Sequence, residues 1–318
     1  MTTTPVKTMR DSLIEGIYHR MRTDERIFFL SADMGAPILD HVRADFADRF
    51  INVGIAEQNM VNVATGLALE GFKVFAYAIA PFFLRAYEQI RIDLALMAQH
   101  RSLNVNLIGV GGGVSYDVSG PTHHCLEDLT VMRALPNLHL FSPCDWQGAA
   151  DFLTYALEVP SPKYIRLDGK AFPAIYTKER PLPAREGFCE LLPGERVCLV
   201  ATGHMTRIAL EIAARFPPGQ VGVIDLFLLK PLLEQRLVQA LSACHHVITM
   251  EEGFIDKGGV DALIRTLCQR HGGPQSITSF GFRDEYMSKF GSREYLYQLN
   301  GCDAQTIMDR VALCLAPG

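Results

Sequence analysis

The sequence predicts an α/β protein with two doubly wound domains, each built on a mainly parallel sheet. Short apolar runs of strand length alternate with amphipathic runs of helix length along most of the chain, and this alternation is typical of parallel sheets covered by helices on both faces. The 318 residues are enough for about two domains. A proline-containing stretch without a clean period, residues 173–190, is expected to be the linker between them.

The first expected domain, residues 1–172, begins with helical spacing and continues with strands and helices in turn. One of its helices consists largely of small residues and ends before Gly71, a helix-terminating glycine. We expect helices at 9–18, 57–70, 82–99 and 146–157, and strands at 26–31, 73–80, 103–110, 138–143 and 163–167.

The second expected domain, residues 191–318, repeats the α/β pattern. We expect strands at 196–203, 221–226 and 246–252, a helix near 208–215, and a further helix opening at Gly258.

The amino-acid composition argues against several classes of protein, among them disordered, nucleic-acid-binding and membrane-spanning proteins. Hydrophobic residues make up 48% and charged residues 20% of the chain, which favours a packed globular protein. The net charge of −5 is spread along the sequence, with no basic block for nucleic acid. The eight cysteines form no C-x-x-C pair, and we find neither a signal pattern nor a membrane-length apolar run. We therefore expect a soluble, cytoplasmic protein.

Glu57 opens the helix of small residues and is the most informative side chain of the sequence. A carboxylate in so apolar a setting is costly to bury unless it is neutral or strongly hydrogen-bonded. The alternative is an exposed glutamate favoured by the helix dipole, and the pattern alone leaves both open.

The run Gly-Ile-Ala-Glu-Gln-Asn-Met at 54–60, followed by Ala64-Thr-Gly-Leu-Ala68, resembles the pyrimidine-binding segment of the transketolase family. Residues 224–232 and the pair Glu251-Glu252 resemble the C-terminal domain of the same family, so the likeness covers almost the whole chain. It implies that Glu57 contacts the aminopyrimidine ring of thiamine diphosphate and shares a proton with ring nitrogen N1′.

The resemblance also implies cofactor contacts for three other residues. Phe82 would stack on the aminopyrimidine, although it also fits a core aromatic at a helix start. Arg85 would face the cofactor or substrate, or else pair with Glu88 on the helix surface. Asp33, directly after a strand, would lie near the cofactor or would cap a turn.

Residues 119–123, Ser-Gly-Pro-Thr-His, resemble the family motif Asp-Gly-Pro-Thr-His. The match implies that His123 is catalytic and faces the substrate, with His124 as a further substrate-binding candidate. Ser119 replaces the aspartate that recognises the hydroxyl beside the acceptor aldehyde, so we expect an acceptor other than an ordinary 2-hydroxy aldose phosphate. Arg166 matches a phosphate-binding arginine but also fits a surface ion pair with Asp168.

The chain contains no Gly-Asp-Gly motif, which in the family helps to hold Mg²⁺ and the diphosphate. We therefore expect no metal ligands here and a separate N-terminal subunit that supplies them, in an α2β2 heterotetramer. Thiamine diphosphate and Mg²⁺ would then lie between subunits, and the substrates would be small sugars or aldehydes.

The resemblance implies a two-carbon ketol transfer, and three alternatives remain. One is the beta subunit of a thiamine-dependent 2-oxo acid dehydrogenase, and another is an enzyme similar to deoxyxylulose phosphate synthase. The third is a non-catalytic partner, which would have no need of Glu57, Phe82 and His123 together.

Overall fold

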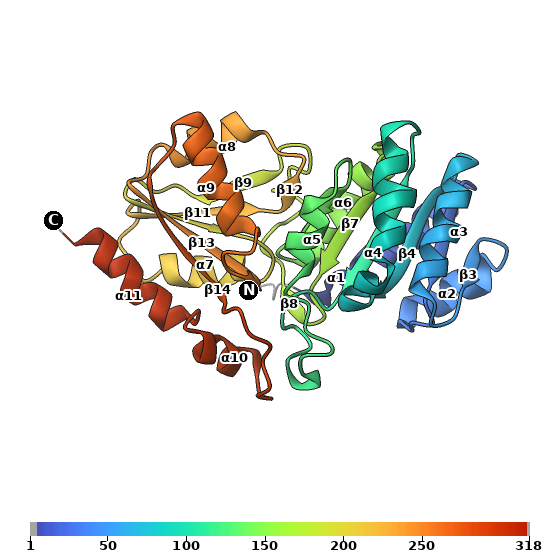
Figure 1. Ribbon diagram of the computed structural model, residues 1–318, viewed down its shortest axis with the longest axis horizontal. Coiled ribbons are helices and arrows are strands. Elements are labelled where there is room, and N and C mark those ends of the chain that lie inside the picture. The colour runs from blue at the N-terminus through green and yellow to red at the C-terminus, as the bar shows by residue number, and fades with distance from the viewer. Residues whose placement is uncertain (1–4, 317–318) are drawn as a thin grey trace. The chain divides into compact units, whose positions relative to one another are not determined.

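The computed structural model describes residues 5–316, which fall into two compact units. Unit 1 contains the described residues up to Gly112, together with Val131–Phe141 and Asp145–Leu182. Unit 2 contains Gly113–Thr130, Ser142–Cys144 and the described residues from Pro183 onward. Figure 1 labels the elements of both units.

Unit 1 has a parallel sheet whose strands follow the order β6-β7-β5-β4-β2-β3. Its central strands β5 and β7 are buried along their whole length, as expected for a sheet covered on both faces. The strands are β2 (Ile27–Ser31), β3 (Phe50–Asn52), β4 (Lys73–Ile79), β5 (Val105–Val110), β6 (His139–Phe141) and β7 (Lys163–Leu167).

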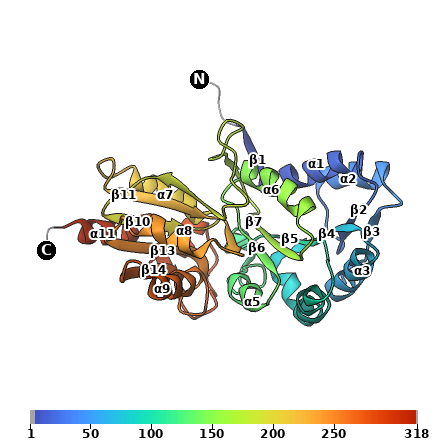
Figure 2. The same ribbon diagram turned by 90° about the horizontal axis from the view of Figure 1, so that it is seen from above.

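Helices cover both faces of this sheet. Figure 2 shows α1 (Met9–Met21), α2 (Pro37–Asp45) and α6 (Trp146–Glu158) on one side and α3 (Glu57–Leu69) on the other. The side chain of Thr8 caps α1 by accepting a hydrogen bond from the amide of Asp11 at 3.0 Å.

The expected helix at 82–99 is helical, but its predicted regularity is wrong. A 3₁₀ helix (Ala80–Ala86) leads into one α-helical turn, α4 (Tyr87–Gln89), then a π-helix (Ile90–Leu96) and a 3₁₀ turn (Met97–Gln99). Hydrophobic spacing reports which residues are buried but does not report a change of hydrogen-bond register, so the sequence could not reveal this.

A short antiparallel ribbon in unit 1 pairs β1 (Val6–Thr8) with β8 (Ala171–Pro173). The sequence analysis did not anticipate it, because three-residue strands carry almost no periodic signal. The residues between Pro173 and β9 (Phe188–Leu192) form no helix or strand. The domain limits 1–172, 173–190 and 191–318 stay a prediction, and unit 2 also takes in Gly113–Thr130.

Unit 2 has a five-stranded sheet in the order β14-β13-β10-β11-β9. Only its edge strand β9 is antiparallel to its neighbour, so the predicted mainly parallel α/β class is confirmed. The remaining strands are β10 (Val197–Ala201), β11 (Val221–Leu226), β13 (His246–Phe254) and β14 (Ser276–Phe282), with β12 (Leu228–Lys230) as a short extra strand.

Two helix layers pack on the unit 2 sheet, with α8 and α9 on one face and α7 and α11 on the other (Figure 1). No helix among residues 5–316 is long and apolar enough to cross a membrane. The helices are α7 (Met205–Ala213), α8 (Glu234–Leu241), α9 (Val260–His271), α10 (Arg293–Asn300) and α11 (Ala304–Leu315), and α5 (Asp128–Ala134) precedes β6.

Candidate active site

The carboxyl edge of the unit 1 sheet gathers most of the predicted site residues of that unit. The strands are parallel, so the residues that follow them meet at one edge, where open α/β sheets bind ligands. Asp33 follows β2, Glu57 opens the helix after β3, Phe82 follows β4, and Arg166 lies near the end of β7.

Glu57 is buried, with 1% of its side chain exposed, and its Oε2 accepts a hydrogen bond from Nη1 of Arg85 at 3.2 Å. The preceding residue, Ala56, offers no side-chain cap, so the first turn of α3 keeps amides that favour a nearby carboxylate. The exposed helix-start alternative is therefore wrong for Glu57. The alternative pairing of Arg85 with Glu88 is also wrong, because Glu88 pairs with Arg91.

Asp33 and Asn52 join the ends of β2 and β3. The Nδ2 of Asn52 donates to Oδ1 of Asp33 at 3.1 Å, and Oδ1 of Asn52 accepts from the amides of Asp33 and Gly54 at 3.0 Å each. Asp33 adopts φ +55°, a backbone conformation that is uncommon outside glycine and is often found at functional sites. Sequence reasoning missed Asn52, which has no motif of its own.

Two adjacent phenylalanines after β4 have different surroundings. Phe83 is fully buried and packs edge-on against Tyr164, with ring centroids 6.2 Å apart. Phe82 is only half-buried. The core aromatic at this helix start is thus Phe83, and Phe82 is the less buried of the two.

Arg166 is buried, with 4% exposed, so the alternative of an ion pair at the surface is wrong. Asp168 is buried as well, and its carboxylate accepts a hydrogen bond from the amide of Lys170 at 2.7 Å. A Cβ on Gly112 would lie 2.7 Å from Cγ of Arg166, so only glycine lets the loop pass over this side chain.

The other predicted residues lie on one loop of unit 2. Ser119 is exposed, and His123 is half-buried with its Nδ1 3.0 Å from Oγ1 of Thr122. His124 is buried, and its Nε2 lies 3.1 Å from the backbone oxygen of Asp117. A carbonyl only accepts, so Nε2 of neutral His124 carries the proton.

Burial lowers the pKa of His124 below its ordinary value, against the opposite influence of the Asp117 oxygen and the nearby carboxylates of Glu252 and Asp117. His124 is therefore neutral at neutral pH. Its Nδ1 is buried and accepts no hydrogen bond from residues 5–316.

A buried network holds this loop to the rest of unit 2. Arg293 donates to Glu252 through Nε at 2.8 Å and Nη2 at 2.6 Å, and the hydroxyl of Tyr297 donates to the same carboxylate at 2.7 Å. The backbone amide of Arg293 donates to Oδ2 of Asp117 at 3.0 Å. The loop is thus tied to the start of α10, and charge-assisted hydrogen bonds tie α10 in turn to Glu252 of β13.

Sequence reasoning found Glu252 only as part of a matching pair and missed Arg293, Tyr297 and Asp117. Their positions are far apart in the chain, and no local spacing signals such a network. Burial raises the pKa of Tyr297 well above its ordinary value, so it remains a hydrogen-bond donor.

A family model of the transketolase pyrimidine-binding domain matches residues 6–173, and one of the transketolase C-terminal domain matches residues 189–307. The chain belongs to the transketolase family. This confirms the resemblance drawn from the run around Glu57 and indicates a transferase of the transketolase type. The roles of individual residues stay predictions.

Several relatives share nearly the whole length of this transketolase-family chain. The B subunit of the apulose-4-phosphate transketolase from Actinobacillus succinogenes is 33% identical over 83% of this chain and 84% of that protein. The putative transketolase C-terminal section of Methanocaldococcus jannaschii is 27% identical over 96% of this chain and 95% of its own length.

Two other matches are a longer enzyme and a solved structure. The 1-deoxy-D-xylulose-5-phosphate synthase of Chlorobaculum tepidum is 34% identical over 86% of this chain but only 42% of its own length. A solved split-gene transketolase, described as an inactive β4 tetramer, has a TM-score of 0.85 at 28% identity and covers 97% of this chain and 98% of its own.

Proposed function

We propose that this chain is the C-terminal subunit of a thiamine diphosphate-dependent transketolase, active with a separate N-terminal subunit. The reaction would transfer a two-carbon ketol unit from a ketose to an aldehyde. The observation that carries the proposal is the buried Glu57 at the carboxyl edge of a parallel sheet. The near full-length match to relatives named as a B subunit and a C-terminal section supports the two-chain arrangement.

The side chains at this edge would fit the aminopyrimidine part of the cofactor. Oε2 of Glu57 is paired with Arg85, whereas Oε1 accepts no hydrogen bond from residues 5–316. In a buried side chain, a carboxylate oxygen without a donor suits a ring nitrogen that shares a proton. The half-buried Phe82, just after the end of β4, offers an aromatic face for stacking.

Thiamine diphosphate, when bound, supplies the nucleophilic carbon and the electron sink that ketol transfer requires. Glu57 would hold a proton at N1′, and Phe82 would fix the ring plane. Arg85 is 59% exposed, so its guanidinium can turn toward solvent at little cost when the carboxylate takes a new partner.

The unit 2 loop would serve the substrate. Thr122 orients the ring of His123 through Nδ1, and the neutral, buried His124 would fix the loop rather than transfer protons. We propose that His123 moves protons at substrate hydroxyls, which suits an imidazole near neutral pH.

Substrate specificity would come from Ser119 and Arg166. Ser119 is exposed and uncharged, so it would hold an acceptor hydroxyl more weakly than an aspartate does. Arg166, buried beside Gly112, would bind a phosphate group through a bidentate pair of hydrogen bonds. The name of the B-subunit relatives, which contains a sugar phosphate, supports a phosphorylated substrate.

The N-terminal subunit would hold Mg²⁺ and the diphosphate in an α2β2 heterotetramer within the cytoplasm. The solved β4 tetramer that is described as inactive supports the need for such a subunit. The eight cysteines, all free in the structure, suit a reducing compartment.

The test is reconstitution. We expect no turnover of ketose phosphates by the chain with thiamine diphosphate and Mg²⁺ alone, and turnover once a Gly-Asp-Gly-containing subunit is added. Turnover by the chain alone would refute the two-subunit proposal. Lipoamide reduction with a 2-oxo acid, in place of ketol transfer, would refute the transketolase activity.

A further inference from the structure

A cavity lies at the amino edge of the unit 1 sheet, opposite the edge that holds Glu57. It measures about 530 Å³, within the range typical of small-molecule sites. Its walls come from the ends of α1, α3 and α6 and from the starts of β2, β4 and β5. Because the strands are parallel, this edge is the one remote from Glu57 and Arg166.

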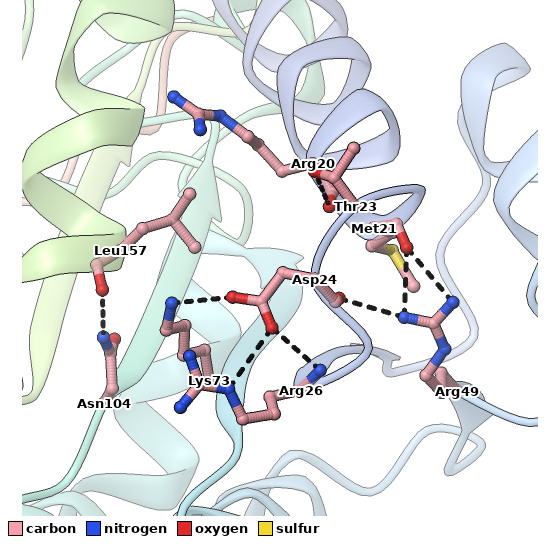
Figure 3. Close-up of polar contacts among 9 residues, drawn as sticks. All are labelled: Arg20, Met21, Thr23, Asp24, Arg26, Arg49, Lys73, Asn104 and Leu157. Carbon is pink, nitrogen blue, oxygen red and sulfur yellow. Dashed lines mark hydrogen bonds and ion pairs between the residues drawn. The ribbon is translucent and has the colours of Figure 1, made fainter.

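Asp24 lies at the centre of the polar wall (Figure 3). One carboxylate oxygen accepts from Nζ of Lys73 at 2.7 Å, and the other accepts from the amide and Nε of Arg26 at 3.0 and 3.4 Å. Burial alone would raise the pKa of Asp24, but these donors hold it at about 2. The carboxylate is therefore ionised and already engaged by its neighbours.

Positive charge exceeds negative charge on this wall. The three cations Arg20, Arg26 and Lys73 line the cavity against two carboxylates, those of Asp24 and of Glu158 at the end of α6. Arg20 is exposed, and its guanidinium makes no hydrogen bond or ion pair within residues 5–316. Figure 3 shows its guanidinium directed away from Asp24.

The carboxyl ends of helices carry partial negative charge and would normally disfavour an anion here. However, several backbone carbonyl oxygens at this edge already accept hydrogen bonds from side chains. Arg49 donates to the backbone oxygens of Met21 and Asp24 at 3.1 Å each, and the side-chain amide of Asn104 donates to the backbone oxygen of Leu157 at 3.1 Å (Figure 3). The wall therefore keeps an excess of one positive charge, three cations against two carboxylates, which favours an anion in the cavity.

The rest of the cavity is partly apolar, with Ile27, Phe72 and Leu157 on its walls. A ligand could place a charged group against Arg20 and Arg26 and an organic part against these side chains. We propose that this cavity is a binding site for a phosphorylated small molecule, separate from the carboxyl-edge site. Such a site would exist whether or not the chain has the transketolase activity proposed above.

The test is a calorimetric titration of the full chain with ribose 5-phosphate, inorganic phosphate and ribose, together with amide hydrogen exchange. We expect saturable binding of ribose 5-phosphate, weaker binding of phosphate and none of ribose. Exchange should slow at residues 20–27 and 71–73. Arg20→Gln should weaken binding about tenfold, because one charged hydrogen bond is lost.

Arg43→Gln is the matched control, since Arg43 is exposed on α2, pairs with Asp40 and does not line the cavity. It should bind as the unchanged chain does, and both variants should unfold at the same temperature. Absence of binding at millimolar probe overturns the proposal. So does binding that Arg20→Gln leaves unchanged, or protection confined to the loop beside Arg166, which would belong to the other site.

Discussion

Nη1 of Arg85 lies 3.2 Å from Oε2 of Glu57, and the two side chains differ sharply in exposure, at 59% and 1%. An exposed cation thus pairs with a buried carboxylate at the edge that we propose as the cofactor site. Such a pair is easily exchanged, because the arginine can be solvated by water while the glutamate needs another partner.

Replacing Arg85 by methionine should therefore destabilise the cofactor-free chain by about 1 kcal/mol, the typical effect of leaving a buried acceptor without its donor after allowance for solvent screening. Urea denaturation measures this. Arg91→Met is the control, because Arg91 pairs with the exposed Glu88. Equal losses in the two variants would mean that the burial of Glu57 does not matter.

Arg293 and Glu252 form a buried pair with 1% and 3% of their side chains exposed. Arg293→Met should cost about 3–5 kcal/mol of unfolding free energy, because it leaves Glu252 charged and buried. Amide exchange at residues 113–125 should also accelerate, because the Arg293 side chain fixes the start of α10 against Glu252, and the Arg293 amide at that point holds Asp117 of the loop. Arg310→Met on α11, whose arginine donates to Thr278 at the surface, should do neither. An unchanged loop exchange rate would contradict the anchoring.

Gly113 lies against the side chain of Glu252, and replacing this glycine tests how closely the two pack. A Cβ there would lie 2.6 Å from Cβ of Glu252, and φ is +63°. Gly219 has φ +83° with no atom near its Cβ position, so Gly219→Ala isolates the backbone strain of about 1–2 kcal/mol. We expect Gly113→Ala to lose about 1–3 kcal/mol more. Equal melting temperatures of the two variants would show that the loop has room to shift.

His124 should make stability depend on pH. Burial lowers its pKa in the folded chain, while the unfolded chain binds a proton near the ordinary value of 6.5. Its stabilising contribution is complete above that value and is lost as the pH falls below it. His124→Gln should flatten the fall in unfolding free energy between about pH 7 and pH 5. An identical slope would mean that His124 titrates normally.

Ser119→Asp tests the acceptor. An aspartate would restore a charge-assisted hydrogen bond to the hydroxyl beside the aldehyde, worth about 1.5–3 kcal/mol, or roughly 10- to 100-fold in kcat/KM. We expect ordinary 2-hydroxy aldose phosphates to become better acceptors for the reconstituted enzyme, with Ser119→Asn as an uncharged control. No gain in kcat/KM would show that specificity lies elsewhere.

The sequence predicted the regular, buried elements well. The strands Val221–Leu226 and Lys163–Leu167 are mainly apolar and buried along their whole length, and their limits match the prediction. The ribbon β1–β8 and the mixed helix that begins at Ala80 were not predictable in the same way, because short strands and hydrogen-bond register leave no hydrophobic period.

The residues of the candidate site also differ in whether the sequence could reveal them. Glu57, Arg166 and His123 lie in local motifs and could be found in the sequence, but the partners of Glu57 and Asp33 could not. Arg85 reaches Glu57 across 28 positions, and Asn52 reaches Asp33 across 19. Arg293 carries no sequence signal of its own, and its pairing with Glu252 depends on tertiary packing.

The proposed activation of thiamine diphosphate by Glu57 is measured most directly by the exchange rate of the cofactor C2 proton with deuterium in the reconstituted enzyme, followed by NMR. Glu57→Gln should slow this exchange by about 10²- to 10⁴-fold while the cofactor remains bound, because general acid–base help of that size is removed. Exchange as fast in Glu57→Gln as in the unchanged enzyme would contradict this role of Glu57.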